Sequence, residues 1–129
     1  MKNLSDLIGK LEKVVNVVAE EVGKSVIEHT PIDTTHAVKN WSVSVDKRSF
    51  DEVGKYPAAG DGYSYAYRSL NEATTIFDIN RNSFISLDNN APYIEALNNG
   101  HSETQAPDGI LTDENINSGI RTAMKRLGF

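Results

Sequence analysis

The sequence contains no cysteine, few prolines and a single tryptophan. The missing cysteine excludes disulfides and every metal site that uses thiolate ligands. There is also no excess of basic residues: the net charge is -5, which argues against a protein that wraps nucleic acid, where a basic stripe is expected. No uninterrupted apolar run reaches the length of a signal peptide or of a membrane-spanning helix, so we expect neither.

The 129 residues that are present fit one globular domain, 1–129, which is long enough to bury a core of its own. Residues 3–28 predict a long helix, because apolar residues recur at helical spacing within an arc of roughly 120°. The arc contains Leu4, Leu7, Ile8, Leu11, Val14, Val15, Val18, Val22 and Val26. Val17 and Ile27 fall outside the arc, on the polar side. They are either single exposed residues or contacts with a neighbouring subunit.

Two later segments alternate between apolar and polar residues and predict strands, at about 41–46 and 83–88. Apolar spacing over residues 64–77 predicts a second helix. Asn90 as an N-cap and Pro92 in a first turn predict a short helix over 91–98, and Gly100 suits its left-handed end. A loop over 100–111 and a last helix over 113–126 follow, and the charge order of that helix matches its dipole. The apolar stripe of the last helix consists of Ile116, Ile120, Met124 and Leu127.

Candidate catalytic and metal-binding residues are few. His101 and Ser102 are adjacent, so their side chains rarely reach hydrogen-bond geometry, and no G-x-S-x-G elbow surrounds them. The histidines, including His29 and His36, lack the spacing of a metal site. We therefore expect no enzymatic activity, no metal and no cofactor. The open alternative is an enzymatic or small-ligand-binding domain whose pocket uses the tyrosine-rich segment at residues 56–67.

Two segments together resemble the signatures of a tailed-bacteriophage protein family. TPIDTTHAVKNW (residues 30–41) resembles T-P-hydrophobic-D-T-G-x-A-x-x-N-W. NNAPYIEALNNGHSETQAPDG (residues 89–109) is similar to N-x-x-P-Y-A-x-x-L-E-x-G-T-S-x-Q-A-P-x-G. The family comprises minor tail components, also called tail-completion or neck proteins, of the minor tail protein Z type. The matching residues to which we assign a structural role are Pro31, Asp33, Asn40, Trp41, Asn89, Pro92, Tyr93 and Gly100.

The resemblance implies an α+β domain, in which the long N-terminal helix packs on a small antiparallel β-sheet beside a short helix and a C-terminal helix. It also implies a structural virion protein of the phage neck, which completes the tail and joins it to the head-side connector. The implied partners are further copies in a ring of six or twelve, and the neighbouring connector and tail proteins. Neither a membrane nor a specific nucleic-acid sequence is an expected partner, although the genome would pass through the ring.

The expected location is the virion and, during assembly, the host cytoplasm. A head-proximal connector adaptor in twelve copies is the other placement that the resemblance leaves open. A closed ring needs a projecting element and a receiving surface on each copy. The loop that Gly100, Pro107 and Gly109 frame suits the projecting role. The residues that we predict at subunit or partner contacts are Val17, Ile27, His101, Ser102, Gln105, Pro107 and Gly109.

Overall fold

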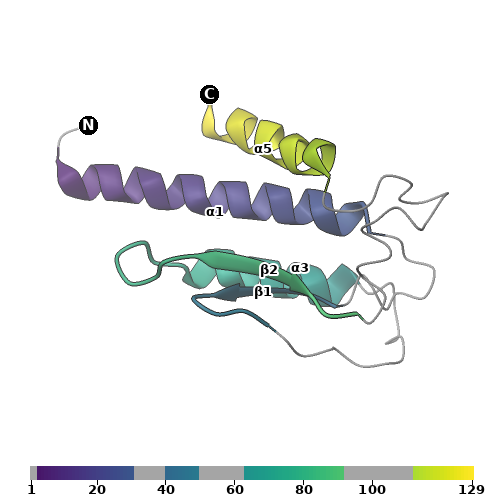
Figure 1. Cartoon of the computed structure of the whole chain (residues 1–129). Helices are drawn as coiled ribbons and strands as arrows, with labels where there is room; N and C mark the ends of the chain where they lie inside the picture. Colours follow the sequence, from purple (N-terminus) through teal and green to yellow (C-terminus); the bar gives the residue numbers. More distant parts are fainter. Residues whose placement is uncertain (1–2, 31–39, 50–62, 92–111) are drawn as a thin grey trace.

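The computed structural model describes residues 3–30, 40–49, 63–91 and 112–129. The elements in chain order are α1 (Leu4–Glu28), β1 (Trp41–Val45), α3 (Tyr63–Ile76), β2 (Ile85–Asn89) and α5 (Asp113–Leu127). The fold is α+β, with a long N-terminal helix and a small antiparallel sheet, as expected (Figure 1). The described helices and strands lie within two residues of their predicted bounds. The predicted short helix, apart from Ala91, and the loop over 100–111 lie outside the described residues.

Side-chain hydrogen bonds fix both ends of α1. Asn3 is the N-cap, and its Oδ1 accepts a hydrogen bond from the Asp6 backbone N–H at 2.9 Å. This bond satisfies one of the free N–H groups of the first turn. At the other end, the Thr30 hydroxyl donates to the Val26 carbonyl at 2.8 Å. This bond holds the residues that follow α1 against its last turn.

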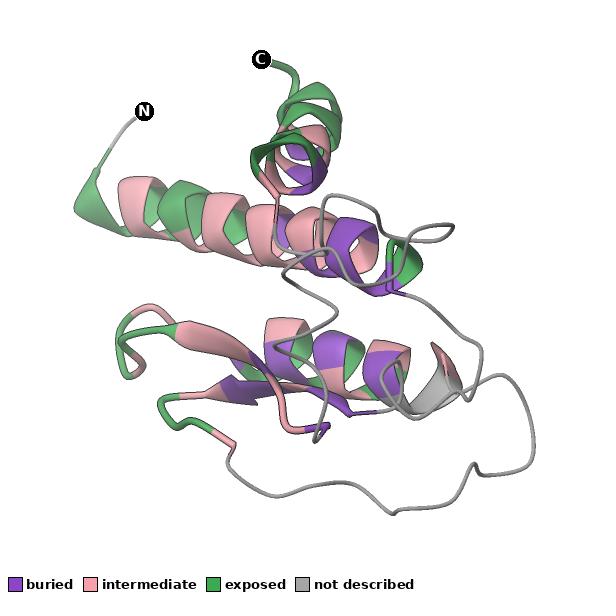
Figure 2. Cartoon of the chain, turned by 45° about the vertical axis from the view of Figure 1, so that its right-hand side comes forward, coloured by how far each residue is buried: buried purple, intermediate pink, exposed green. Residues whose placement is uncertain are grey.

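The helix α1 is the middle layer of the molecule. Figure 1 shows α5 along one side of α1, and the sheet with α3 along the other. The two strands are antiparallel, with Trp41 opposite Asn89 and Val45 opposite Ile85. The buried core lies where the C-terminal half of α1 meets β1 and α3, and its fully covered members are drawn purple in Figure 2. The core cluster consists of Val26, Ile27, Trp41, Val43, Ala66, Leu70 and Ala73.

The turn before β2 is held by Asp46, which has a left-handed backbone with φ of 58° although it is not glycine. Its carboxylate accepts hydrogen bonds from the Asn82 side chain at 2.9 Å and from the backbone N–H groups of Ser83 and Phe84 at 2.6 and 3.2 Å. The bonds from Asn82 and Ser83 lower the pKa of Asp46. These bonds stabilise the uncommon conformation and fix where β2 begins.

The predicted apolar stripe of α1 is not the buried face of that helix, which corrects the expectation from periodicity. Only Val26 of the stripe is buried, and Leu4 and Leu11 are 70% and 47% exposed. Val17 and Ile27, expected on the exposed side, are buried at 7% and 0% exposure. The reason is that α5 and α3 cover the flanks of α1, so the buried surface lies on both sides of the stripe.

The helix α5 shows the same shift of the buried face. The residues that it buries are Asn115, Gly119 and Ala123, which are small or polar. A Cβ atom on Gly119 would lie 2.5 Å from the Val22 Cα, so the two helix backbones approach closely here. The predicted stripe of α5 points to the side instead, and its Met124 is 45% exposed.

Charged side chains hold α5 against α1 along one edge. Arg126 donates to Glu21 at 2.6 Å and lies 3.4 Å from Glu20, which also pairs with Lys24 at 3.0 Å. Burial raises the pKa of Glu20, but the hydrogen bond from Lys24 and the positive charges around it outweigh this effect and lower it. The Ser25 hydroxyl adds a buried hydrogen bond to the Asn115 carbonyl at 2.6 Å. The polar contacts therefore fix the orientation of α5 on α1, and the small residues let the two helices approach closely.

A nearly buried carboxylate, Asp88, ties the segment after β1 to β2. Arg48 donates to Asp88 Oδ1 through Nε at 2.9 Å and Nη2 at 2.6 Å, and the Ser49 N–H donates to Oδ2 at 3.0 Å. Burial raises the pKa of Asp88, but the hydrogen bonds from Arg48 and Ser49 outweigh it, so the net pKa is lowered. The ionised carboxylate is therefore part of the folded structure.

The lowered pKa predicts an acid-sensitive contribution to stability. A folded-state pKa below the unfolded value of about 3.9 stabilises the fold fully above that value, and the effect is lost as the pH falls through the folded pKa. We expect Asp88→Asn to lower the unfolding free energy by about 1–2 kcal/mol at pH 7. The difference between variant and parent should shrink below pH 4 in urea titrations. Asp6→Asn, at an exposed carboxylate, is the control, and an equal effect there would contradict the prediction.

Candidate interaction groove

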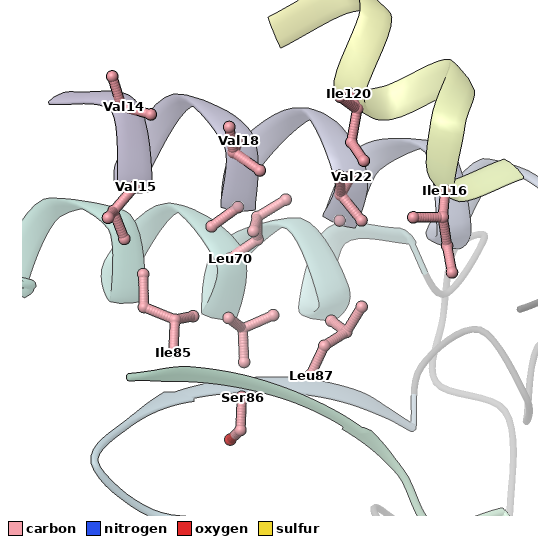
Figure 3. Close-up of a pocket in the computed structure, with 13 residues that line it drawn as sticks. Val14, Val15, Val18, Val22, Leu70, Ile85, Ser86, Leu87, Ile116 and Ile120 are labelled. Atoms are coloured by element: carbon pink, nitrogen blue, oxygen red, sulfur yellow. The ribbon is translucent and has the colours of Figure 1, made fainter. Parts of the chain in front are cut away.

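An apolar groove of about 530 Å³ opens between α1, α5 and the sheet. Figure 3 shows side chains from all these elements converging on it. Its described lining contains no charged side chain. We call it the valine groove, after the residues that α1 contributes. Its lining residues are Val14, Val15, Val18, Ala19, Val22, Gly23, Val43, Leu70, Ile85, Ser86, Leu87, Ile116 and Ile120.

The sheet supplies one wall of the valine groove through the alternation of β2. Ile85 and Leu87 point into the groove and Ser86 points away (Figure 3), as a period of two requires. The Ser86 hydroxyl donates to the Lys47 carbonyl at 2.6 Å. Leu70 of α3 closes the groove from behind, where it also contacts Gly23 of α1. Each side chain of this wall therefore belongs to a paired strand or to a helix that packs on the core.

The helices α1 and α5 form the other walls of the groove, through the apolar faces that helical periodicity predicted. Val14, Val18 and Val22 come from the predicted stripe of α1, and Ile116 and Ile120 come from that of α5. All five side chains are only partly buried. Two amphipathic helices thus turn their apolar stripes toward a shared opening, while their small and flanking residues form the contact between them.

The stripe of α1 continues beyond the groove toward the N-terminus. We call Leu4, Leu7, Ile8 and Leu11 the leucine segment. Leu4 and Leu11 are exposed, and Leu7 and Ile8 are half-buried. A second hollow of about 420 Å³ lies beside this segment, and its lining is mixed: it consists of Leu4, Ser5, Ile8, Gly9, Glu12 and Asn80. An apolar surface therefore extends along most of the length of α1, which is the kind of surface that marks an interaction site.

The described signature residues form a junction of hydrogen bonds and buried side chains. Trp41 Nε1 donates to the Thr30 hydroxyl at 2.8 Å, which in turn donates to the Val26 carbonyl at 2.8 Å. Asn40 is fully buried beside this chain of hydrogen bonds. Trp41 stands opposite Asn89 in the sheet register, so the two sequence signatures meet at this strand pair. Asn89 Oδ1 also accepts from the Ala91 N–H at 3.0 Å, which turns the chain at the end of β2.

The predicted contact residues divide into two groups. Val17 and Ile27 are buried inside the chain, so their predicted position on the exposed side is wrong, and they offer no surface to another subunit. The others lie outside the described residues, so their role stays a prediction: His101, Ser102, Gln105, Pro107 and Gly109. The remaining signature residues, Pro31, Asp33, Pro92, Tyr93 and Gly100, lie outside them too.

The described tyrosines of the tyrosine-rich segment lie outside the lining of the groove. Among its described side chains, Tyr63 and Tyr67 stack with ring centroids 6.0 Å apart and pack against the core. The Tyr67 hydroxyl also donates to Glu28 at 3.3 Å. These contacts give Tyr63 and Tyr67 a role in attaching α3 to the core, and the groove is lined by aliphatic side chains.

Within the described part of the chain, no group of three or more histidine, cysteine, aspartate or glutamate side chains is placed to hold a metal ion. No helix within those residues is both long and apolar enough to span a membrane. Comparisons with protein-family models, curated proteins and solved structures found no match to this chain.

Proposed function

We propose that this chain is a structural protein of the bacteriophage neck, which completes the tail and joins it to the head-side connector as a component of a ring. The observation that supports this proposal most directly is the valine groove. Its walls are the apolar stripes of α1 and α5, which remain partly exposed. An extended apolar surface on a rigid fold is typical of a protein that works by contacting other proteins.

The signature residues support the same proposal from another direction. Thr30, Asn40 and Trp41 match the first signature and are engaged in packing and hydrogen bonds. Residues that pack and form buried hydrogen bonds stabilise a fold. This agrees with a family whose members share an architecture and not a catalytic reaction. The pairing of Trp41 with Asn89 brings the second signature to the same place.

The test is the morphology of particles made by the phage or prophage whose genome encodes this chain. Disrupting its gene should yield filled heads and separate tails, because the joint between them is missing. Adding the purified chain to that lysate should restore joined particles, and an exposed-site variant such as Lys10→Gln should do so equally well. Normal infectious particles from the disrupted gene would contradict the proposal.

Labelled chain mixed with the separated halves distinguishes the two placements in the neck. Binding to tails is expected for a tail-completion protein, whereas binding to filled heads is expected for the head-proximal adaptor in twelve copies. Electron microscopy of the bound half also gives the number of copies in the ring. Label on neither half would count against both placements.

A further inference from the structure

The valine groove and the leucine segment belong to one continuous stripe on one helix. The valine groove covers residues Val14 to Val22 of α1, and the leucine segment covers Leu4 to Leu11. One part is an apolar hollow between α1, α5 and the sheet, and the other is a row of aliphatic side chains at the start of α1, of which Leu4 and Leu11 are exposed. A hollow and a matching row on the same face can complete each other when two copies meet.

We propose that two copies of this chain pair through antiparallel α1 helices, so that the leucine segment of each copy fills the valine groove of the other. In this arrangement, contacting residues have sequence numbers that add to the same total. Three pairs on the apolar stripe then meet across the two-fold axis: Leu4 with Val22, Ile8 with Val18 and Leu11 with Val15. A helix that binds an apolar groove through positions i, i+3, i+4 and i+7 is a common recognition mode, and the leucine segment has this spacing.

The size of the groove agrees with this occupant. An engineered cavity of about 150 Å³ accepts one benzene, so a groove of about 530 Å³ has room for several aliphatic side chains. The leucine segment supplies four of them. The volume therefore suits inserted side chains, while the backbone of the partner helix lies across the mouth of the groove.

The overlap of the two helices alone supplies about a third of the contact area of a standard interface. The overlap from Leu4 to Val22 is about 27 Å long at 1.5 Å per residue, and a helix is about 10 Å wide, so the helix pair alone covers roughly 270 Å². The walls that α5 and β2 add on each copy extend this footprint toward the ~800 Å² per partner of standard interfaces. Antiparallel packing also places opposite ends of the helix dipoles side by side, which is favourable.

The geometry favours this closed pair over a staggered row. A parallel arrangement shifted by eleven residues would also match the stripe, because Leu4 then meets Val15 and Leu11 meets Val22. Each copy would leave one groove or one leucine segment open, and further copies would extend the row without closing it. The antiparallel pair fills both grooves at once. The pairing does not rest on the proposed role in the neck, and within that role it makes the valine groove a contact between two copies of this chain.

Cross-linking can test the register, because the chain has no cysteine of its own. Two single variants, Leu4→Cys and Val22→Cys, should form a disulfide-linked dimer when they are mixed and oxidised. Neither variant alone should do so, because the two copies of one position lie about 27 Å apart along the helix pair. Mixing Leu4→Cys with Val15→Cys is the matched control and should give little product.

A second measurement keeps the proposal testable without cysteine. Leu11→Glu places a charge at the centre of the pair and should raise the dimer dissociation constant at least tenfold in sedimentation experiments. Lys10→Glu, at the neighbouring exposed position, should change it less than threefold, and both variants should keep the parent circular dichroism spectrum. The proposal is overturned if the chain sediments as a monomer at high concentration. It is also overturned if Leu4→Cys links to Val15→Cys instead, or to itself at an equal rate.

Discussion

Replacing Trp41 with alanine is expected to lower the free energy of unfolding by about 3–5 kcal/mol. The indole is 2% exposed and lies in the core cluster where α1, β1 and α3 meet. Its loss leaves a cavity that the surrounding strand and helices cannot fill completely. Urea denaturation followed by far-ultraviolet circular dichroism measures the change.

Two variants separate the contributions to this loss. Trp41→Phe keeps most of the ring but removes the N–H that donates to Thr30, and it should cost about 1–3 kcal/mol, between the full truncation and a surface change. Phe84→Ala is the control, because Phe84 is an aromatic residue that is 44% exposed. Its effect should stay within about 1 kcal/mol. A loss that small at Trp41→Ala would mean that the indole is not buried.

Replacing Gly119 with alanine is expected to destabilise the protein by about 2–3 kcal/mol, as overpacking of a close contact does. The added methyl carbon would lie 2.5 Å from the Val22 Cα and 2.8 Å from the Glu21 carbonyl oxygen. Both neighbours are backbone atoms, so α5 would have to move away from α1. Thermal and urea denaturation, compared with the parent chain, measure the loss.

The matched control for Gly119 is a glycine on the open side of α1. A Cβ atom on Gly9 would meet nothing within 4 Å. Gly9→Ala should therefore stabilise the chain by roughly 0.5–1 kcal/mol through helix propensity alone. The same substitution then has opposite signs at the two positions. Stabilisation by Gly119→Ala would show that the two helices are not in close contact.

Local sequence signals predicted the elements of this fold well. The structure adds the cap Asn3, which periodicity placed inside the first helix. Asn3 and Thr112 stand directly before α1 and α5, and each accepts a hydrogen bond from a backbone N–H in the first turn. Periodicity and capping depend on neighbours in the sequence, so they can be read without knowing the fold. The alternation in WSVSV likewise predicted β1, although Ser44, expected on the open face, is buried too.

The same signals did not predict which face of each helix is buried. Periodicity identifies the most apolar stripe, but it does not say whether the chain itself covers that stripe. Here α1 has neighbours on two sides, so Val17 and Ile27 are buried while Leu4 and Leu11 are exposed. The contact with α5 uses Gly119, whose importance depends on a helix far away in the sequence.

The valine groove was missed for the same reason, although a signal for it existed. The apolar stripe of α1 extends to Leu4 at its start, further than the short sheet covers. Valine is a mediocre helix former. The run of valines in α1 is therefore explained by the contacts of these side chains and not by helix propensity. Two apolar stripes on helices that pack together through other residues are a sign of an apolar surface that the chain leaves partly uncovered.

The junction of Trp41 with Thr30 and Asn89 has a practical consequence for experiments. The chain has one tryptophan, so fluorescence excited selectively at tryptophan reports on one place only. Loss of packing there exposes the indole to water and shifts its emission to longer wavelength. Detachment of α5 leaves the indole covered. If the fluorescence transition occurs after the loss of the helical circular dichroism signal, then α5 detaches from α1 before the core around Trp41 unfolds.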